Sequence, residues 1–193
     1  GIKKADGLLL TSASPEHITG AFCLVENGRI DAIYMPAGIS NDQIGMKLLT
    51  EAAARYQVPV VFLESGSKLV SGDLQITALI PEDKNESMMA VKLSYKNISV
   101  MLPGDLSPFA GRHGPADTWR ADVAAMPSHG DRSRSEVDAA VILISRGWRY
   151  PRWIPDPYDI LQNEGTAVFS TYRNGAVTLH INGKTVRVTK MIE

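Results

Sequence analysis

The chain has 193 residues with 20 basic and 21 acidic side chains, and its net charge of −1 excludes a globally basic protein that holds nucleic acid or anionic lipid by overall charge. Hydrophobic residues make up 44% of the sequence and charged residues 21%, a composition typical of a globular protein and not of a disordered one. No run of 18 apolar residues occurs, so this segment itself is not expected to span a membrane.

In the first part of the chain, short apolar runs alternate with helical patterns. Residues 7–11 are largely apolar and predict a buried strand. Ser14–Glu16 then predicts the start of a helix, because it supplies an N-cap serine, a proline at the first helical position and an acid in the first turn. This helix is expected to end near Asn27–Gly28, a C-cap pair. The single cysteine, Cys23, stands in an apolar run of the helix, which predicts a buried side chain.

The next segment repeats this alternation. Residues 29–35 alternate in polarity and predict a strand, and Asn41–Asp42 predicts the cap of a second helix. Six apolar side chains of that helix are expected to share one face: Ile44, Leu48, Leu49, Ala52, Ala53 and Tyr56. Residues 59–63 are apolar throughout and therefore predict a central strand.

From Lys68 onward, strand patterns dominate. The predicted strands are residues 74–80, 88–95, 98–102, 121–126, 139–144, 167–171, 176–181 and 185–189. Lys96–Asn97 predicts a tight turn, and Asn174–Gly175 and Asn182–Gly183 predict hairpin turns. A polar loop is expected over residues 127–136 and a short helix over residues 156–163. Helices interspersed in a largely β chain predict an α/β (α+β) sandwich in a single domain, residues 1–193.

Four segments that follow predicted strands, or lie near them, carry the side chains best suited to chemistry. They are residues 12–17, 103–105, 128–131 and 148–157. The first three contain imidazole or carboxylate groups, which are ligands for zinc or manganese. A hydrolase with two metal ions needs several such ligands and a bridging carboxylate.

Four longer stretches stand in a fixed order: GIKKADGLLLTSASPEHITGA, KNESMMAVKLSYKNISVMLPGDL, RADVAAMPSHGDRSRS and WRYPRWIPDPYDILQNEGTAVFSTYRNGAVTL. In this order they resemble the metallo-β-lactamase-like domain of ComEC-type DNA-internalisation competence proteins. The matching family segments are an H-x-H-x-D-H loop, a strand pair ending in T-G-D, a segment with P-H-H-G-S, and a Y-x-H-P segment with the terminal strands. The resemblance implies an αββα fold, of which this chain is expected to hold the later portion with the opening strands missing.

The resemblance also implies which residues stand at the metal-binding positions of the first loop. The two leading histidines of the family correspond to Ser12 and Ser14, its aspartate to Glu16 and its last histidine to His17. Serine hydroxyls are poor zinc ligands beside imidazole and carboxylate. Residues 14–16 are also fully explained as a helix start, and His17 also fits an ordinary helix imidazole.

The later loops keep part of the implied ligand set. The bridging aspartate corresponds to Asp105 and the histidine pair to Ser128 and His129, whereas the late histidine has no counterpart in residues 150–155. Asp105 also fits an ordinary turn after a strand. Asp105 and His129 are the candidate catalytic residues. The candidate metal ligands are Glu16, His17, Asp105 and His129, and the expectation is no cofactor or a weakly bound divalent metal, zinc or manganese.

A basic segment forms the second candidate site. Its arginine and hydroxyl groups predict phosphate or nucleic-acid binding at Arg132, Arg134, Ser135, Arg149 and Arg152. Aromatic side chains at positions 148, 150 and 153 interleave with these arginines and suit stacking on single-stranded bases. This is the only basic feature that the sequence pattern singles out. Acidic side chains between positions 117 and 138 offset its charge, so a solvated loop with salt bridges is the alternative.

Three functions stay open on this reading. The first is a degenerate domain of a ComEC-type competence protein that takes part in DNA uptake during natural transformation, with reduced or no metal-dependent hydrolysis. The second is a divergent metal-dependent phosphodiesterase or nuclease that acts on the DNA strand that is not imported. The third is a stand-alone protein with a metallohydrolase fold. Whether the chain is an enzyme is left open.

The resemblance also implies partners and a location. Single-stranded DNA is the candidate ligand, and the membrane-spanning part of the same full-length protein is the expected partner. The segment is expected to be a soluble extracytoplasmic domain associated with the bacterial cell membrane, without membrane insertion of its own.

Overall fold

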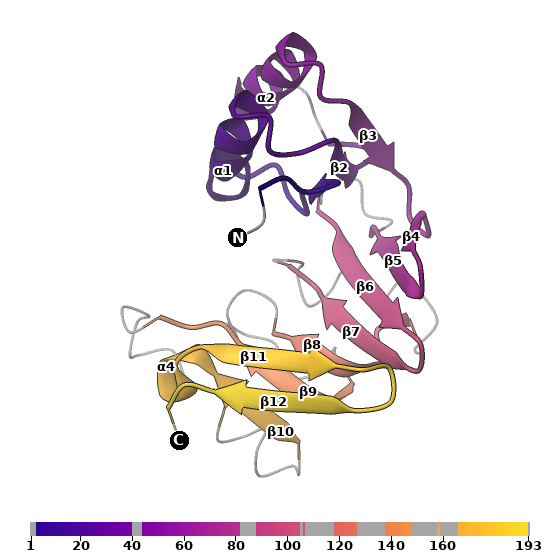
Figure 1. Ribbon diagram of the computed structural model, residues 1–193, viewed down its shortest axis with the longest axis vertical. Coiled ribbons are helices and arrows are strands. Elements are labelled where there is room, and N and C mark those ends of the chain that lie inside the picture. The colour runs from indigo at the N-terminus through magenta and orange to yellow at the C-terminus, as the bar shows by residue number, and fades with distance from the viewer. Residues whose placement is uncertain are drawn as a thin grey trace. The chain divides into compact units, whose positions relative to one another are not determined.

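The computed structural model describes residues 3–39, 44–81, 88–104, 106, 118–126, 138–147, 158 and 166–192. Contacts divide the chain into two compact units (Figure 1). Unit 1 comprises Gly1–Ser67 with Ala78–Met89, and unit 2 comprises Lys68–Thr77 with Ala90–Glu193. In the part of the chain that is described, no helix is long and apolar enough to cross a membrane.

Unit 1 is built from alternating strands and helices. Within its described residues, a parallel sheet has the order β1-β2-β3, with β1 at Leu8–Leu9, β2 at Ile33–Pro36 and β3 at Val60–Leu63. The two connecting helices, α1 (Pro15–Glu26) and α2 (Ile44–Arg55), lie side by side and pack against each other (Figure 1). Side chains of both helices and of β2 form one apolar core, which includes Val25, Ile33, Met35, Met46 and Leu49.

Helix α1 confirms the predicted start and end. It begins at Pro15 after Ser14, whose backbone is extended, and ends at Glu26, followed by Gly28 with a φ of +60°. Cys23, however, is exposed, so the prediction of a buried thiol is wrong. Ala21 and Val25 form the buried stripe, one helical turn apart, and Cys23 lies between them in sequence and therefore on the opposite side of the helix.

Helix α2 and strand β3 differ from their predicted burial. The buried side chains of α2 are Met46, Leu49 and Ala53, whereas Ile44 and Leu48 of the predicted face are 78% and 50% exposed. Tyr56, just beyond the helix, is exposed as well. Strand β3 was predicted to be central, but in the described sheet it pairs only with β2 and is an edge strand, on which Val61 and Phe62 are exposed. An apolar composition alone does not show which side chains of α2 are buried or whether β3 is a central strand.

Unit 2 contains the larger sheet. In the described residues, seven strands pair in the order β10-β9-β8-β7-β6-β5-β4. Their bounds are β4 Lys68–Ser71, β5 Leu74–Leu79, β6 Ala90–Tyr95, β7 Ile98–Leu102, β8 Ala121–Ala125, β9 Ala139–Ile144 and β10 Ala167–Ser170. The last residues of β5 belong to unit 1. The strands β7, β8, β9 and β10 run parallel to one another, whereas β4–β5 and β6–β7 are antiparallel hairpins. The four parallel strands therefore end at the same edge of the sheet, the carboxyl edge.

Of the three turns predicted in unit 2, two form as expected and one does not. Lys96, with a φ of 53°, forms the tight turn between β6 and β7 as expected. Asn182–Gly183 joins β11 (Val177–Ile181) to β12 (Val186–Lys190) as a hairpin, also as expected. Asn174–Gly175 is not a hairpin turn, because Thr171–Asn174 forms the short helix α4, Gly175 follows it and β10 pairs with β9 instead of β11. The predicted loop 127–136 lies outside the described residues, as does the predicted helix 156–163 apart from Tyr158.

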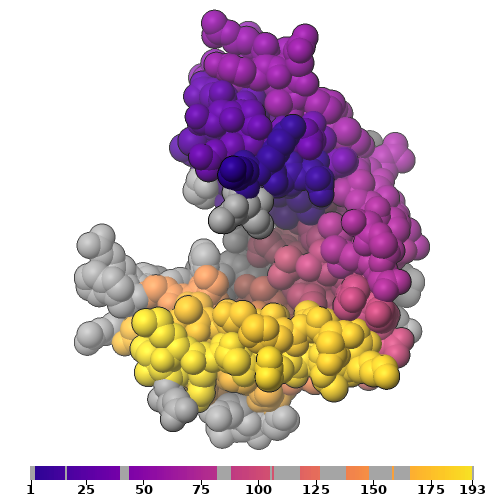
Figure 2. All heavy atoms as spheres, in the orientation of Figure 1, coloured from indigo at the N-terminus to yellow at the C-terminus, as the bar shows by residue number. Residues whose placement is uncertain are grey.

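The β11–β12 hairpin packs on one face of the large sheet. Its inner-face residue Ile181 lines a small apolar pocket of about 330 Å³ together with Leu93 and Tyr95 of β6 and with residues of β5 and β7. The hairpin turn also touches the β6–β7 turn, where the Asn97 amide donates to the Gly183 carbonyl at 3.3 Å. Lys96 in that turn pairs with Asp73 at 3.4 Å, and the hydrogen bond to Asp73 raises the pKa of Lys96. In the space-filling view the hairpin is a continuous yellow surface (Figure 2).

Candidate functional site

The loop between β1 and α1 occupies the first predicted site. Its backbone is fixed by the Met89 amide, which donates to the Thr11 carbonyl at 2.8 Å, and by an isolated bridge between Ser12 and Met88. The Ser12 side chain is 6% exposed, and its Oγ accepts the Ser14 backbone N–H at 3.1 Å. Ser14 stands at the N-cap position of α1, yet its side chain makes no capping hydrogen bond. The loop is therefore held by Ser12 and by the backbone.

The candidate ligands of this loop lie in the first turn of α1. The His17 amide donates to the Ser14 carbonyl at 3.0 Å, and the His17 side chain is half-buried. Glu16 lies in the same turn, and its side chain is outside the described set. No group of three or more His, Cys, Asp or Glu side chains in the described ranges is placed to hold a metal ion. The described donors of the loop are two hydroxyls and one imidazole, and hydroxyls are poor zinc ligands beside imidazole and carboxylate.

Asp105 and His129 lie outside the described residues, and so does the predicted phosphate site at Arg132, Arg134, Ser135, Arg149 and Arg152. For Asp105 and His129, the structure does describe residues that shortly precede them in sequence. Gly104 follows β7, and Met126 follows β8. The two strands are adjacent and parallel, with Val100 paired to Val123. Gly104 and Met126 therefore lie at the same carboxyl edge of unit 2, the edge where parallel sheets carry their ligand sites.

The same edge holds a residue pair that sequence reasoning did not connect. Arg146, just after β9, is 7% exposed. Its amide donates to Thr171 Oγ1 at 2.8 Å, and Thr171 Oγ1 donates to the Arg146 carbonyl at 3.0 Å. Thr171 directly follows β10, which is parallel to β9. The sequence does show a hydroxyl residue, Thr171, directly after a strand, and this was the signal available for a side-chain contact. Its partner, Arg146, lies 25 residues away in sequence, so the pair could not be predicted from the local pattern.

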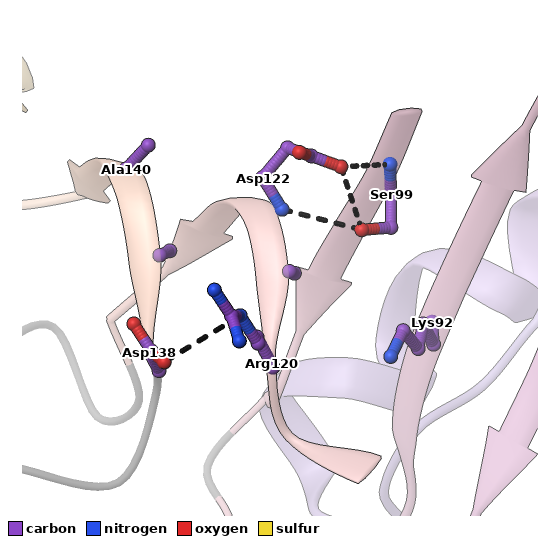
Figure 3. A pocket seen from close by; sticks show the side chains of 8 residues that line it. Lys92, Ser99, Arg120, Asp122, Asp138 and Ala140 are labelled. Atoms are coloured by element: carbon purple, nitrogen blue, oxygen red, sulfur yellow. Dashed lines mark hydrogen bonds and ion pairs between the residues drawn. The ribbon is translucent and has the colours of Figure 1, made fainter. Parts of the chain in front are cut away.

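A polar surface pocket of about 520 Å³ lies near the starts of β8 and β9 (Figure 3). Asp122 Oδ2 accepts the Ser99 amide at 2.7 Å and the Ser99 hydroxyl at 2.8 Å, which ties β8 to β7. Arg120 pairs with Asp138 at 3.7 Å, and both side chains are largely exposed, so this pair adds little stability. Because the pocket lies mainly at the amino ends of these strands, it is separate from Gly104 and Met126 at the carboxyl edge.

Removing the Asp122 carboxylate tests the tie between β7 and β8. The Asp122→Ala variant is expected to lower the free energy of unfolding by about 1 kcal/mol, because two hydrogen bonds from Ser99 lose their acceptor. Asp122→Asn keeps one side-chain oxygen and is expected to recover most of the loss. Urea denaturation followed by tryptophan fluorescence measures both variants. Equal losses in the two variants would mean that charge, and not hydrogen bonding, stabilises this position.

No protein-family model matches the chain. In sequence, the chain is similar to ComE operon protein 3 of Bacillus subtilis (strain 168), with 26% identity over 193 residues. The alignment covers 92% of this chain and 25% of that protein, so the chain spans about a quarter of the length of this curated relative. The similarity confirms the resemblance to ComEC-type competence proteins that the four motif stretches indicated.

Solved structures confirm the predicted fold. The metallo-β-lactamase fold protein YhfI from Bacillus subtilis superposes with a TM-score of 0.56 at 11% identity, covering 96% of this chain and 77% of that one. CmlA, a diiron β-hydroxylase from Streptomyces venezuelae, superposes with a TM-score of 0.54 at 14% identity, covering 98% of this chain and 45% of that one. At these identities the likeness concerns the fold alone. The chain has a metallo-β-lactamase-like α/β (α+β) fold.

Proposed function

We propose that the chain is a degenerate metallo-β-lactamase-like domain of a ComEC-type competence protein, which handles DNA during uptake without a tightly bound pair of metal ions. The observation that carries this proposal is the role of Ser12. This residue stands at the position of a metal-binding histidine, and its buried hydroxyl accepts the Ser14 amide. A hydroxyl that orders its own loop acts as a structural group, and it is a poor substitute for imidazole.

The assignment to DNA uptake is supported by the sequence similarity to ComE operon protein 3. Because the chain spans 25% of that protein, the remaining length is the proposed source of the membrane-spanning part. In this proposal the present segment is an extracytoplasmic domain held at the membrane by the rest of the chain. Reporter fusions at either end of the segment in the full-length protein would test its side of the membrane, and a cytoplasmic signal would contradict this placement.

A second candidate is a phosphodiesterase or nuclease with one weakly bound zinc or manganese ion. The parallel pairing of β7 with β8 favours it. This pairing places Gly104, which directly precedes Asp105, and Met126, which stands three residues before His129, at one edge of the sheet. The residues that would hold the metal are Glu16, His17, Asp105 and His129. A bound metal ion would supply an activated water for attack on a phosphodiester.

Metal analysis separates the two candidates. After incubation with zinc or manganese and removal of free ions, elemental analysis is expected to find well below one metal ion per chain. No divalent-dependent cleavage of a single-stranded oligonucleotide or of bis(p-nitrophenyl) phosphate is expected. The reason is that the loss of imidazole ligands removes most of the affinity of the site.

The opposite result would establish the second candidate. It consists of about one metal ion or more per chain, lost together with cleavage in Asp105→Asn and in His129→Ala. Asp6→Asn is the matched control, because Asp6 is an exposed aspartate of unit 1 outside the candidate site. If Asp6→Asn lost the metal as well, the binding would be non-specific and would support neither a site nor hydrolysis.

A further inference from the structure

The C-terminal segment of the chain has a charge that differs from the rest of the protein. Residues 166–193 contain Arg173, Lys184, Arg187 and Lys190 and a single acidic side chain, Glu193. This segment therefore carries a net charge of +3 in a chain whose total is −1. The sequence pattern had singled out only the arginines between positions 132 and 152, because the cations of the C-terminal segment are spread over two strands and a turn.

Hairpin pairing brings these separated residues together. In the β11–β12 register His180 lies opposite Arg187, and Thr178 lies opposite Thr189. These four side chains point to the same face of the hairpin, because paired residues share a face, and all four are exposed. Thr189 Oγ1 lies 3.4 Å from His180 Nε2. The outer face of the hairpin thus presents hydroxyl and cationic groups without an apolar side chain between them.

The cations of the hairpin are available to a ligand. Lys184 in the turn, Arg187 on the outer face and Lys190 at the end of β12 are all exposed. Within the described part of the chain, no ion pair engages any of the three side chains. Arg173 differs, because its guanidinium stacks on the Tyr158 ring at 4.2 Å. Of these three cations, Arg187 lies on the outer face and Lys184 lies in the turn beside it, whereas Lys190 pairs with Val177 and shares the inner-face side of β12 with Val186 and Val188.

The other face of the hairpin is already used for packing. Val177, Leu179, Ile181, Val186 and Val188 alternate with the exposed residues and are half-buried. Ile181 among them lines the apolar pocket with β6. The outer face is thus presented to solvent by a hairpin whose position in unit 2 is fixed, which lowers the ordering cost of binding.

We propose that the outer face of the β11–β12 hairpin binds the phosphate backbone of single-stranded DNA. This inference rests on the proposed function and names the surface that would hold the DNA. Cationic and hydroxyl groups are the donors that contact phosphate oxygens in protein–DNA complexes. The exposed Tyr172 ring lies in α4, whose last residue accepts amide hydrogen bonds from the two residues after β12, and a ring at that end of the hairpin suits stacking on an unpaired base.

A binding measurement with matched charge changes tests the proposal. Fluorescence anisotropy with a labelled oligo-dT compares the wild-type chain with Lys184→Gln/Arg187→Gln and with Lys47→Gln/Arg55→Gln. The control pair removes the same charge from exposed positions of α2 in unit 1. The hairpin variant is expected to bind about tenfold more weakly at low salt, and the slope of log affinity against log salt is expected to fall by about 1.4, since each phosphate contact contributes about 0.7 for single strands. The control variant is expected to bind like the wild type.

The outcomes separate the two proposals. If the wild type binds oligo-dT and the hairpin variant binds equally well, the hairpin is not the DNA surface, while DNA handling by the chain stands. If the wild type does not bind oligo-dT at all, both the proposed function and this inference fail. Sedimentation with phosphatidylserine vesicles covers the other polyanion: vesicle binding that is lost in the hairpin variant, without oligonucleotide binding, would assign the face to a membrane surface and overturn the proposal. Urea denaturation verifies that both variants are folded.

Discussion

Replacing Leu49 with alanine is expected to lower the free energy of unfolding by about 2–5 kcal/mol, the range for a large-to-small change in a packed core. Leu49 is 0% exposed and belongs to the core of unit 1 together with residues of α1 and β2. The change removes three carbon atoms from this core, and the surrounding side chains are held by two helices and a sheet, so they can fill the cavity only in part. Urea denaturation followed by far-UV circular dichroism measures the loss, because α1 and α2 supply most of the helix in the described residues.

Leu48 provides a matched control on the same helix. It is 50% exposed, so Leu48→Ala removes the same atoms from a surface position and is expected to change the stability by no more than about 0.5 kcal/mol. Comparable losses in the two variants would mean that Leu48 is buried in solution, as the sequence pattern predicted. A large loss in Leu48→Ala alone would contradict the observed orientation of α2.

Helix α2 shows why the sequence predicts an element better than its buried face. The helical spacing of apolar residues is clear, and the helix is present at Ile44–Arg55. However, this helix has more apolar residues than one face can hold, so the pattern permits more than one stripe. Met46, Leu49 and Ala53 are the buried set, and Met46 was not in the predicted set. The choice depends on which side faces α1 and the sheet, and this is set by contacts between segments far apart in the sequence.

The same limit applies to the turns. Both Asn–Gly pairs of the C-terminal region have the local chemistry of a hairpin, and only Asn182–Gly183 forms one. At Asn174–Gly175 the strand before the pair, β10, hydrogen-bonds to β9 through parallel pairing. The Asn174 side chain, which is buried, accepts the Ser170 amide at 3.0 Å and helps to form the short helix α4. Pairing between distant strands therefore overrides the local turn preference.

Of the candidate site, the sequence predicts the loops but not their internal contacts. The positions after β1, β7 and β8 were predicted from strand ends and from the motif order, and these strands are present. The role of Ser12 as an acceptor for the Ser14 amide could not be predicted, because it depends on the conformation of the loop between them. The basic hairpin face was missed for a related reason. Its cations become neighbours only through the pairing of β11 with β12.

Gly183 is the position where the hairpin turn meets the rest of unit 2, and Gly183→Ala is expected to lower the free energy of unfolding by about 1–3 kcal/mol. Two effects add. The residue has a φ of +84°, which side chains with a Cβ rarely adopt. An added Cβ would also lie 2.6 Å from Lys96 Cδ and 2.9 Å from Lys96 Cβ, so the hairpin turn or the β6–β7 turn must move. Tryptophan fluorescence in urea follows this change, because the three tryptophans at positions 119, 148 and 153 belong to unit 2.

Gly20 supplies a control for the same glycine-to-alanine substitution, with the opposite expected effect on stability. It lies inside α1, and an added Cβ would meet nothing within 4 Å. Gly20→Ala is therefore expected to raise the stability by about 0.5–1 kcal/mol, because alanine loses less backbone entropy in a helix than glycine does. A stabilising effect of Gly183→Ala would contradict the close contact between the two turns. If Gly183→Ala destabilises unit 2 and also weakens oligo-dT binding while the protein remains folded, the docked position of the hairpin is needed for its outer face to bind DNA.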